Sequence, residues 1–143
     1  MRVLLAFLAF FMAIQCSKDE PYKPPVETFP VNGVTLFVNG QALVVVEQNE
    51  VLMNNLVLPL DAHSPQIEVI FTDDGEPYIA DQSATLGLEV ANPEIATASL
   101  VPSDTFKFVM HGKSIGQTTF QVRLLYSNNP GYESPNIPVS VSN

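Results

Sequence analysis

The segment VTLFVNGQALVVV, residues 34–46, contains the clearest hairpin signal in the chain. Two runs of apolar and β-branched residues flank the dipeptide Asn39-Gly40. Asn-Gly favours a type I′ turn, because both central residues tolerate positive φ. We therefore predict that residues 34–38 and 41–46 are two paired antiparallel strands.

The same pattern continues from residue 31 to the carboxyl terminus. Short β-branched and apolar runs are separated, every eight to twelve residues or so, by Asn, Gly, Pro or Asp, and this spacing is typical of all-β sandwiches. No window after residue 30 has the sustained spacing of an amphipathic helix. We predict an all-β fold, a sandwich of about seven to nine antiparallel strands. The further strands are expected at 51–60, 66–71, 86–90, 106–110, 120–124 and 137–141.

Composition limits the classes of partner. The 143 residues, 46% of them hydrophobic, suffice for one domain with a core. Fifteen acidic residues against six basic ones give a net charge of -9, which lacks the positive surface that nucleic acid requires. The one cysteine excludes an internal disulfide and the paired thiolates of a structural zinc site. We expect no nucleic-acid partner.

The amino terminus has the layout of an export signal. A positive end is followed by twelve apolar residues, 3–14, and then by Gln15 and Cys16. Twelve residues fall short of the roughly 20 that a membrane-spanning helix needs. We predict that residues 1–15 are a cleaved signal peptide and that residues 16–30, rich in proline and charge, form an extended tether.

The position of Cys16 resembles that of the lipidated cysteine in bacterial lipoproteins. Residues 13–15 resemble a relaxed lipobox of the Bacteroidota type, although Gln15 stands where a small residue is usual. The alternative is a buried free cysteine, but a charged, proline-rich segment follows it. The resemblance implies that the membrane is a partner, through a lipid on Cys16 that anchors the protein to the outer membrane; each buried acyl CH2 contributes about 0.8 kcal/mol.

The four residues after the cysteine resemble the Bacteroidota export tag that directs lipoproteins to the outer face of the outer membrane. This resemblance implies a surface-exposed protein. A solvated charge run in the tether is the alternative, and a periplasm-facing location stays open with it. The tag residues are Ser17, Lys18, Asp19 and Glu20.

Three motifs in the second half resemble bacterial immunoglobulin-like domains of group 2 type. These motifs are NPEIATA at 92–98, FKFVMHGK at 106–113 and GQTTFQV at 116–122. The resemblance covers residues 31–143 and implies an immunoglobulin-like β-sandwich in which these residues serve folding. The FTDDGE loop at 71–76 and the ending, with LLY at 124–126 and YESPNIPVSV at 132–141, also resemble small Bacteroidota lipoproteins, many of which have histidine clusters that suggest metal handling.

Two sequence matches to enzyme motifs fail on context. Residues 112–116 match G-x-S-x-G, the nucleophile elbow of α/β-hydrolases, but no Asp or His follows Ser114 and no helix is expected there. The same residues resemble the end of a P-loop, yet Lys107 stands where that loop needs glycine. We therefore expect no enzymatic activity and no cofactor.

The weak metal candidates are two acids and two histidines. Asp73 and Asp74 could offer oxygens to calcium, but they lack the alternating ligand spacing of a calcium loop, and an acidic turn is the alternative. His63 and His111 lie 48 positions apart, so they could share a metal only if the fold brings them together. We predict separate surface histidines and no metal.

One loop has a composition that suits recognition. Tyr126 and Tyr132 flank a polar segment that contains Asn128 and Asn129, and such a segment could contact a protein or a glycan. An ordinary hairpin loop is the alternative. We predict a non-catalytic, lipid-anchored cell-envelope module with an adhesive, structural or accessory role. The alternative function is a metal- or small-ligand-binding lipoprotein accessory to outer-membrane uptake.

Overall fold

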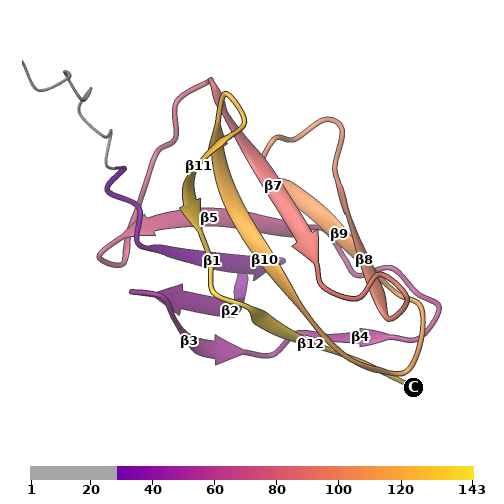
Figure 1. Cartoon of the computed structure of the whole chain (residues 1–143). Helices are drawn as coiled ribbons and strands as arrows, with labels where there is room; N and C mark the ends of the chain where they lie inside the picture. Colours follow the sequence, from indigo (N-terminus) through magenta and orange to yellow (C-terminus); the bar gives the residue numbers. More distant parts are fainter. Residues whose placement is uncertain (1–28) are drawn as a thin grey trace, which may run out of the picture.

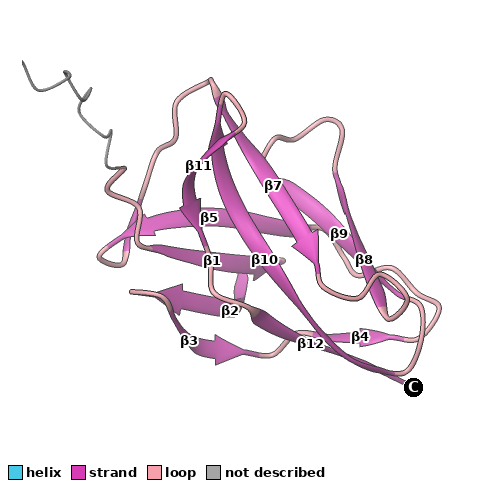
Figure 2. Cartoon of the chain, in the orientation of Figure 1, coloured by secondary structure: helices cyan, strands magenta, loops and turns pink. Residues whose placement is uncertain are grey.

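The computed structural model describes residues 29–143. The predicted signal peptide, Cys16, the export tag and most of the tether therefore lie outside the described residues. Figure 2 shows strands and loops throughout 29–143 and no helix in that range, so the prediction of an all-β fold is confirmed. It follows that this part of the chain contains no helix long and apolar enough to cross a membrane.

The strands form two sheets that enclose one core (Figure 1). In the first sheet the order is β3-β2-β1-β5-β9-β8, and β6 pairs with β5. All its pairs are antiparallel. Its strands are β1 Gly33–Val38, β2 Gln41–Glu47, β3 Glu50–Asn54, β5 Ile67–Asp73, β6 Glu76–Pro77, β8 Ala96–Leu100 and β9 Lys107–Gly112.

The second sheet is built around the long strand β10. Along one edge β10 pairs with β7, and along the other it pairs first with β12 and then with β11. The short strand β4 pairs with β12 in parallel, unlike the antiparallel pairs elsewhere in this sheet. The strands are β4 Val57–Pro59, β7 Ala84–Val90, β10 Gly116–Tyr126, β11 Asn129–Glu133 and β12 Ile137–Ser142.

The first hairpin is as predicted. β1 and β2 pair antiparallel around Asn39 and Gly40, whose φ angles are 51° and 76°. Positive φ at both positions is the requirement of a type I′ turn. The inward residues of the two strands are fully buried in the core: Val34, Leu36, Val44 and Val46.

The strand predicted at 51–60 is wrong, because the chain changes sheets within it. Asn54 ends β3, and its Nδ2 donates to the carbonyl of Pro138 at 2.7 Å while its Oδ1 accepts from the amide of Leu56 at 3.0 Å. These side-chain bonds satisfy backbone groups where the ladder stops, and the chain then enters the second sheet as β4. With β4, β6, β8 and β11, residues 29–143 contain twelve strands, more than the seven to nine expected.

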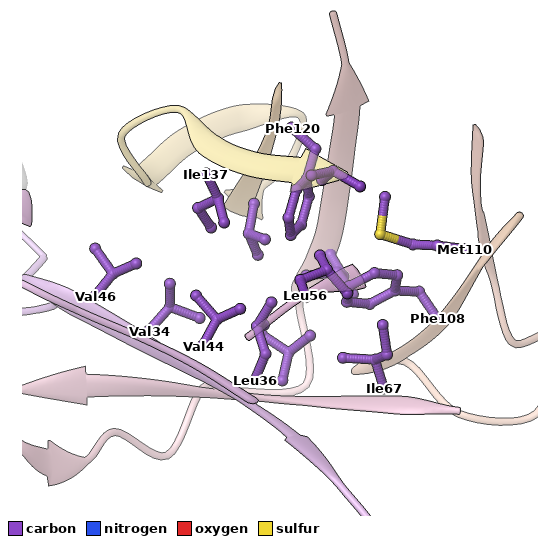
Figure 3. Packing of buried hydrophobic residues seen from close by; sticks show 14 of the residues in the cluster. Val34, Leu36, Val44, Val46, Leu56, Ile67, Phe108, Met110, Phe120 and Ile137 are labelled. Atoms are coloured by element: carbon purple, nitrogen blue, oxygen red, sulfur yellow. The ribbon is translucent and has the colours of Figure 1, made fainter. Parts of the chain in front are cut away.

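The core joins the two sheets through aromatic and aliphatic side chains (Figure 3). Phe108 of β9 and Phe120 of β10 are fully buried, with ring centroids 6.1 Å apart. The predicted alternation in the last strand is confirmed, since Ile137, Val139 and Val141 all face the core. Residues 29–143 contain both sheets and the core between them, which is the complete core that an independently folding domain requires.

Candidate functional site

The domain has two distinct ends, separated by the length of β10. The eleven residues of β10 extend over about 33 Å. At one end Phe29 stacks on Tyr126, with ring centroids 4.3 Å apart and planes within 3°. At the opposite end β10 begins at Gly116, beside the carboxyl terminus (Figure 1). The chain therefore enters the domain at the Tyr126 end.

The three motifs that resemble bacterial immunoglobulin-like domains meet at the Gly116 end. The Nζ of Lys113 donates to the carbonyl of Pro93 at 2.9 Å, and its amide donates to the carbonyl of Ile95 at 2.8 Å. The amide of Asn92 donates to Thr118 Oγ1 at 3.0 Å. These bonds close the turn between β7 and β8 against the loop between β9 and β10. Residues of the three motifs thus hydrogen-bond these two loops to each other.

The Gly112 to Gly116 segment connects two strands. β9 precedes Ser114 and β10 follows it, so the strand-turn-helix context of a hydrolase elbow or a P-loop is replaced by a strand-turn-strand. Ser114 is exposed, and its amide donates to the carbonyl of Ile95. A Cβ at Gly112 would lie 2.5 Å from the carbonyl oxygen of Pro59, so the close approach of β4 to β9 requires glycine.

The structure brings His63 and His111 together, contrary to the expectation of two separate surface histidines. The connection between β4 and β5 aligns antiparallel to the end of β9, and the two histidines are directly paired. Their rings stack with centroids 4.4 Å apart and planes inclined by 23°. His63 is exposed and His111 half-buried. This long-range pairing has no local signal in the sequence, which is why it was missed.

The two acidic candidates lie near the opposite end, where Asp73 ends β5 and Asp74 lies in the turn between β5 and β6. The Asp74 carboxylate accepts from Asn32 Nδ2 at 2.6 Å, and the Asp74 amide donates to Asn32 Oδ1 at 3.0 Å. Asp74 has a φ of 48°, typical of a tight turn. Within residues 29–143, no three His, Cys, Asp or Glu side chains gather in a way that could hold a metal ion. These contacts favour the alternative interpretation, an acidic structural turn.

The predicted recognition loop is a two-residue turn. Ser127 and Asn128 adopt φ angles of 49° and 67°, and Asn129 already begins β11. Tyr132 is only 7% exposed and its ring packs against Phe71, with centroids 5.8 Å apart. Tyr132 is therefore a core residue and is unavailable for surface contacts.

Two tyrosines near this turn have perturbed ionisation. Burial raises the pKa of Tyr132 to about 12, because the phenolate would lose its hydration. Burial also raises the pKa of Tyr126, with a further contribution from its hydrogen bond to Tyr78, whose hydroxyl lies 3.2 Å away. In both tyrosines the loss of hydration is the largest cause of the raised pKa.

An apolar hollow that the sequence analysis missed lies between β5 and the segment after β6. Its volume is about 290 Å³, and Ile79 at its rim is 92% exposed. The only local signal is the short apolar run that follows Pro77. The hollow is lined by Val69, Ile70, Phe71, Tyr78, Ile79, Ala80 and Phe106.

No protein-family model and no curated protein matches this sequence. Among solved structures, the S-layer protein SbsC, domains 4 and 5, is similar with a TM-score of 0.47 and 16% identity over 62% of this chain and 47% of that chain. Domains 5-6 of SbsC give a TM-score of 0.44 and 17% identity over 61% and 39%. The chain thus spans less than half the length of either solved chain.

Proposed function

We propose that this protein is a non-catalytic, lipid-anchored module of the cell envelope that presents the loops at its Gly116 end to a partner. The observation that supports this proposal is the separation of the two ends of the domain. The chain enters beside Tyr126, whereas the loops next to Ile95 and Gly116 gather at the other end of β10. A domain held at one end offers the other end for contact.

The proposed anchor sets the distance at which the loops are held. Twelve residues, 17–28, separate Cys16 from Phe29, and a fully extended chain between these two residues reaches about 45 Å at most. The length of β10 adds about 33 Å. The net charge of -9 repels an anionic membrane surface and so favours an extended arrangement.

The domain also offers surfaces suited to an adhesive or accessory role. β3 and β8 are the edge strands of the first sheet, and edge strands have unpaired backbone groups that can accept another strand. Leu52 of β3 and Leu100 of β8 are large apolar side chains exposed on these edges. The partner in this proposal is an envelope protein or a glycan.

Metabolic labelling with a radioactive fatty acid, followed by membrane fractionation, tests the anchor. We expect label in the wild-type protein and its recovery with the outer membrane. Cys16→Ala should lose the label and leave the membrane fraction, whereas the matched control Ser17→Ala should behave as wild type. An unlabelled wild-type protein in the soluble fraction would refute the proposal.

A second candidate function, a metal-binding lipoprotein accessory to uptake, is favoured by one specific observation. His63 and His111 lie in ring contact at the same end of the domain as the presented loops.

A further inference from the structure

We propose that His63 and His111 form a two-histidine binding site for a divalent transition-metal cation, with Cu²⁺ as the most tightly bound. The pair lies on two segments that are far apart in the sequence and adjacent in the structure. This inference deepens the second candidate function and is independent of how the protein is anchored.

The backbone holds the two histidines opposite each other. The Gly112 amide donates to the Ala62 carbonyl at 3.1 Å, and the Ser64 amide donates to the Met110 carbonyl at 2.7 Å. These bonds flank the histidines on both sides, which makes them a non-hydrogen-bonded antiparallel pair. In such pairs the Cα atoms are about 4.5 Å apart and the side chains are closest.

Side-chain bonds hold the same segment further in place. The Ser64 hydroxyl accepts from the Met110 amide at 3.0 Å and donates to the Pro65 carbonyl at 2.8 Å. The Asp61 amide donates to the Gly112 carbonyl at 2.8 Å. The connection between β4 and β5 is therefore fixed to β9 on either side of His63, and binding a cation would not have to order it first.

A shared cation requires one of the stacked rings to turn. The lone pairs of the ring nitrogens lie in the ring planes, and two planes inclined by 23° with centroids 4.4 Å apart do not meet near the rings. Two neighbouring ligands of square-planar Cu²⁺, at metal–nitrogen distances of about 2.0 Å, lie about 2.8 Å apart. The short distance between the rings brings this spacing within reach once the His63 side chain rotates. His63 is exposed and has room for this rotation.

The type of ligand selects the type of metal. Imidazole suits copper, zinc and nickel, and Cu²⁺ binds most strongly in the order of divalent first-row metals. Calcium and magnesium prefer oxygen ligands. No third His, Cys, Asp or Glu joins the pair within the described part of the chain, so water would fill the remaining positions. Such an open site suits a reversibly bound cation better than a structural one.

Calorimetric titration of residues 29–143 with Cu²⁺ tests the site, using a protein without a histidine tag. This range contains both histidines and excludes Cys16, whose thiol would also bind copper. We expect one Cu²⁺ per chain, competition by Zn²⁺, and no displacement by millimolar Ca²⁺. Electron paramagnetic resonance of the copper complex should show nitrogen ligands from imidazole.

Variants separate the histidine pair from other ligands. His63→Gln and His111→Gln should each weaken Cu²⁺ binding at least tenfold, and the double variant should be little weaker than either, because one imidazole alone cannot chelate. Asp73→Asn, at the end of β5 beside the acidic turn, should bind as wild type. Unchanged affinity in both histidine variants, or no wild-type binding below millimolar Cu²⁺, would overturn the proposal.

Thermal unfolding of each variant, with and without Cu²⁺, distinguishes loss of the metal site from loss of the fold. Cu²⁺ that binds the folded pair should raise the unfolding midpoint of the wild-type domain, and a free concentration 100 times Kd should increase the folded-to-unfolded ratio about 100-fold. His63→Gln changes an exposed residue and should keep the metal-free midpoint while losing the copper-induced shift. A shift of equal size in His63→Gln would also overturn the proposal.

Discussion

Ser134 takes the place of a strand partner for Val122. The Ser134 hydroxyl accepts from the Val122 amide at 3.0 Å, and the Ser134 amide donates to the Val122 carbonyl at 2.9 Å. β11 ends at Glu133 and β12 begins at Ile137, so this is where one edge of β10 changes its partner. Ser134 is 2% exposed. Because Ser134 bonds both the amide and the carbonyl of Val122, neither backbone group is buried and unpaired where β11 gives way to β12.

Replacing this hydroxyl should destabilise the domain. Ser134→Ala leaves the Val122 amide buried without an acceptor, and we expect a loss of about 1–3 kcal/mol in the free energy of unfolding. Denaturant unfolding monitored by circular dichroism measures it. The matched control is Ser142→Ala, an exposed serine in β12, which should change stability by less than about 0.5 kcal/mol. Equal stability of the two variants would contradict the assigned role of Ser134.

Gly112→Ala should be more damaging than a change at a neighbouring exposed position. The added Cβ would lie 2.5 Å from the Pro59 carbonyl oxygen, so β4 or β9 must move, at a cost of about 1–3 kcal/mol. Ser114→Ala in the same connection should be nearly neutral. Thermal unfolding of both variants measures the difference. If Gly112→Ala unfolds at the wild-type temperature, the close approach of β4 to β9 is contradicted.

Alkaline pH should destabilise the domain through Tyr132. Burial raises its pKa to about 12, above the value near 10 of an unfolded chain, so between these values the unfolded state binds fewer protons. The contribution of Tyr132 is intact below pH 10 and falls as pH rises, by at most about 1.4 kcal/mol per pH unit. Unfolding curves measured across this range should show the decline, and Tyr132→Phe should reduce it.

At neutral pH, Tyr132→Phe should leave the domain as stable as wild type or slightly more so. The hydroxyl of Tyr132 is buried and has no hydrogen-bond partner among residues 29–143, so removing it relieves a desolvation cost. Tyr126→Phe provides the contrast, because it loses the hydrogen bond to Tyr78. A destabilised Tyr132→Phe would indicate a partner for this hydroxyl.

The stack of Phe29 on Tyr126 should protect the start of the domain from proteolysis. Aromatic pairs contribute about 0.5–1.5 kcal/mol beyond their buried area. We expect Phe29→Ala to be cleaved faster near residues 29–32, while Phe29→Tyr keeps the stack and the wild-type rate. Limited proteolysis with mass spectrometry locates the cut. Identical cleavage in the two variants would show that the stack does not hold this segment.

The sequence predicted the elements that depend on local chemistry. The Asn39-Gly40 turn was predictable because its positive φ angles depend on the two turn residues alone. The buried positions of residues 137–141 were predictable from the alternation of apolar and polar residues. The end of β3 at Asn54 was not predictable, because it depends on a hydrogen bond to the Pro138 carbonyl, which is remote in the chain. The same limitation applies to His63 and His111, whose contact depends on the register of a connection against β9.

Protease treatment of intact cells tests the central claim, that Cys16 anchors the domain at the cell envelope with its loops presented outward. The wild-type protein, Cys16→Ala and a known periplasmic protein are compared by blotting with an antibody to the domain. We expect rapid loss of the wild-type domain while the periplasmic protein survives, and no cell-bound domain accessible to protease in Cys16→Ala. Survival of the wild-type domain, with Cys16→Ala behaving identically, would contradict the account.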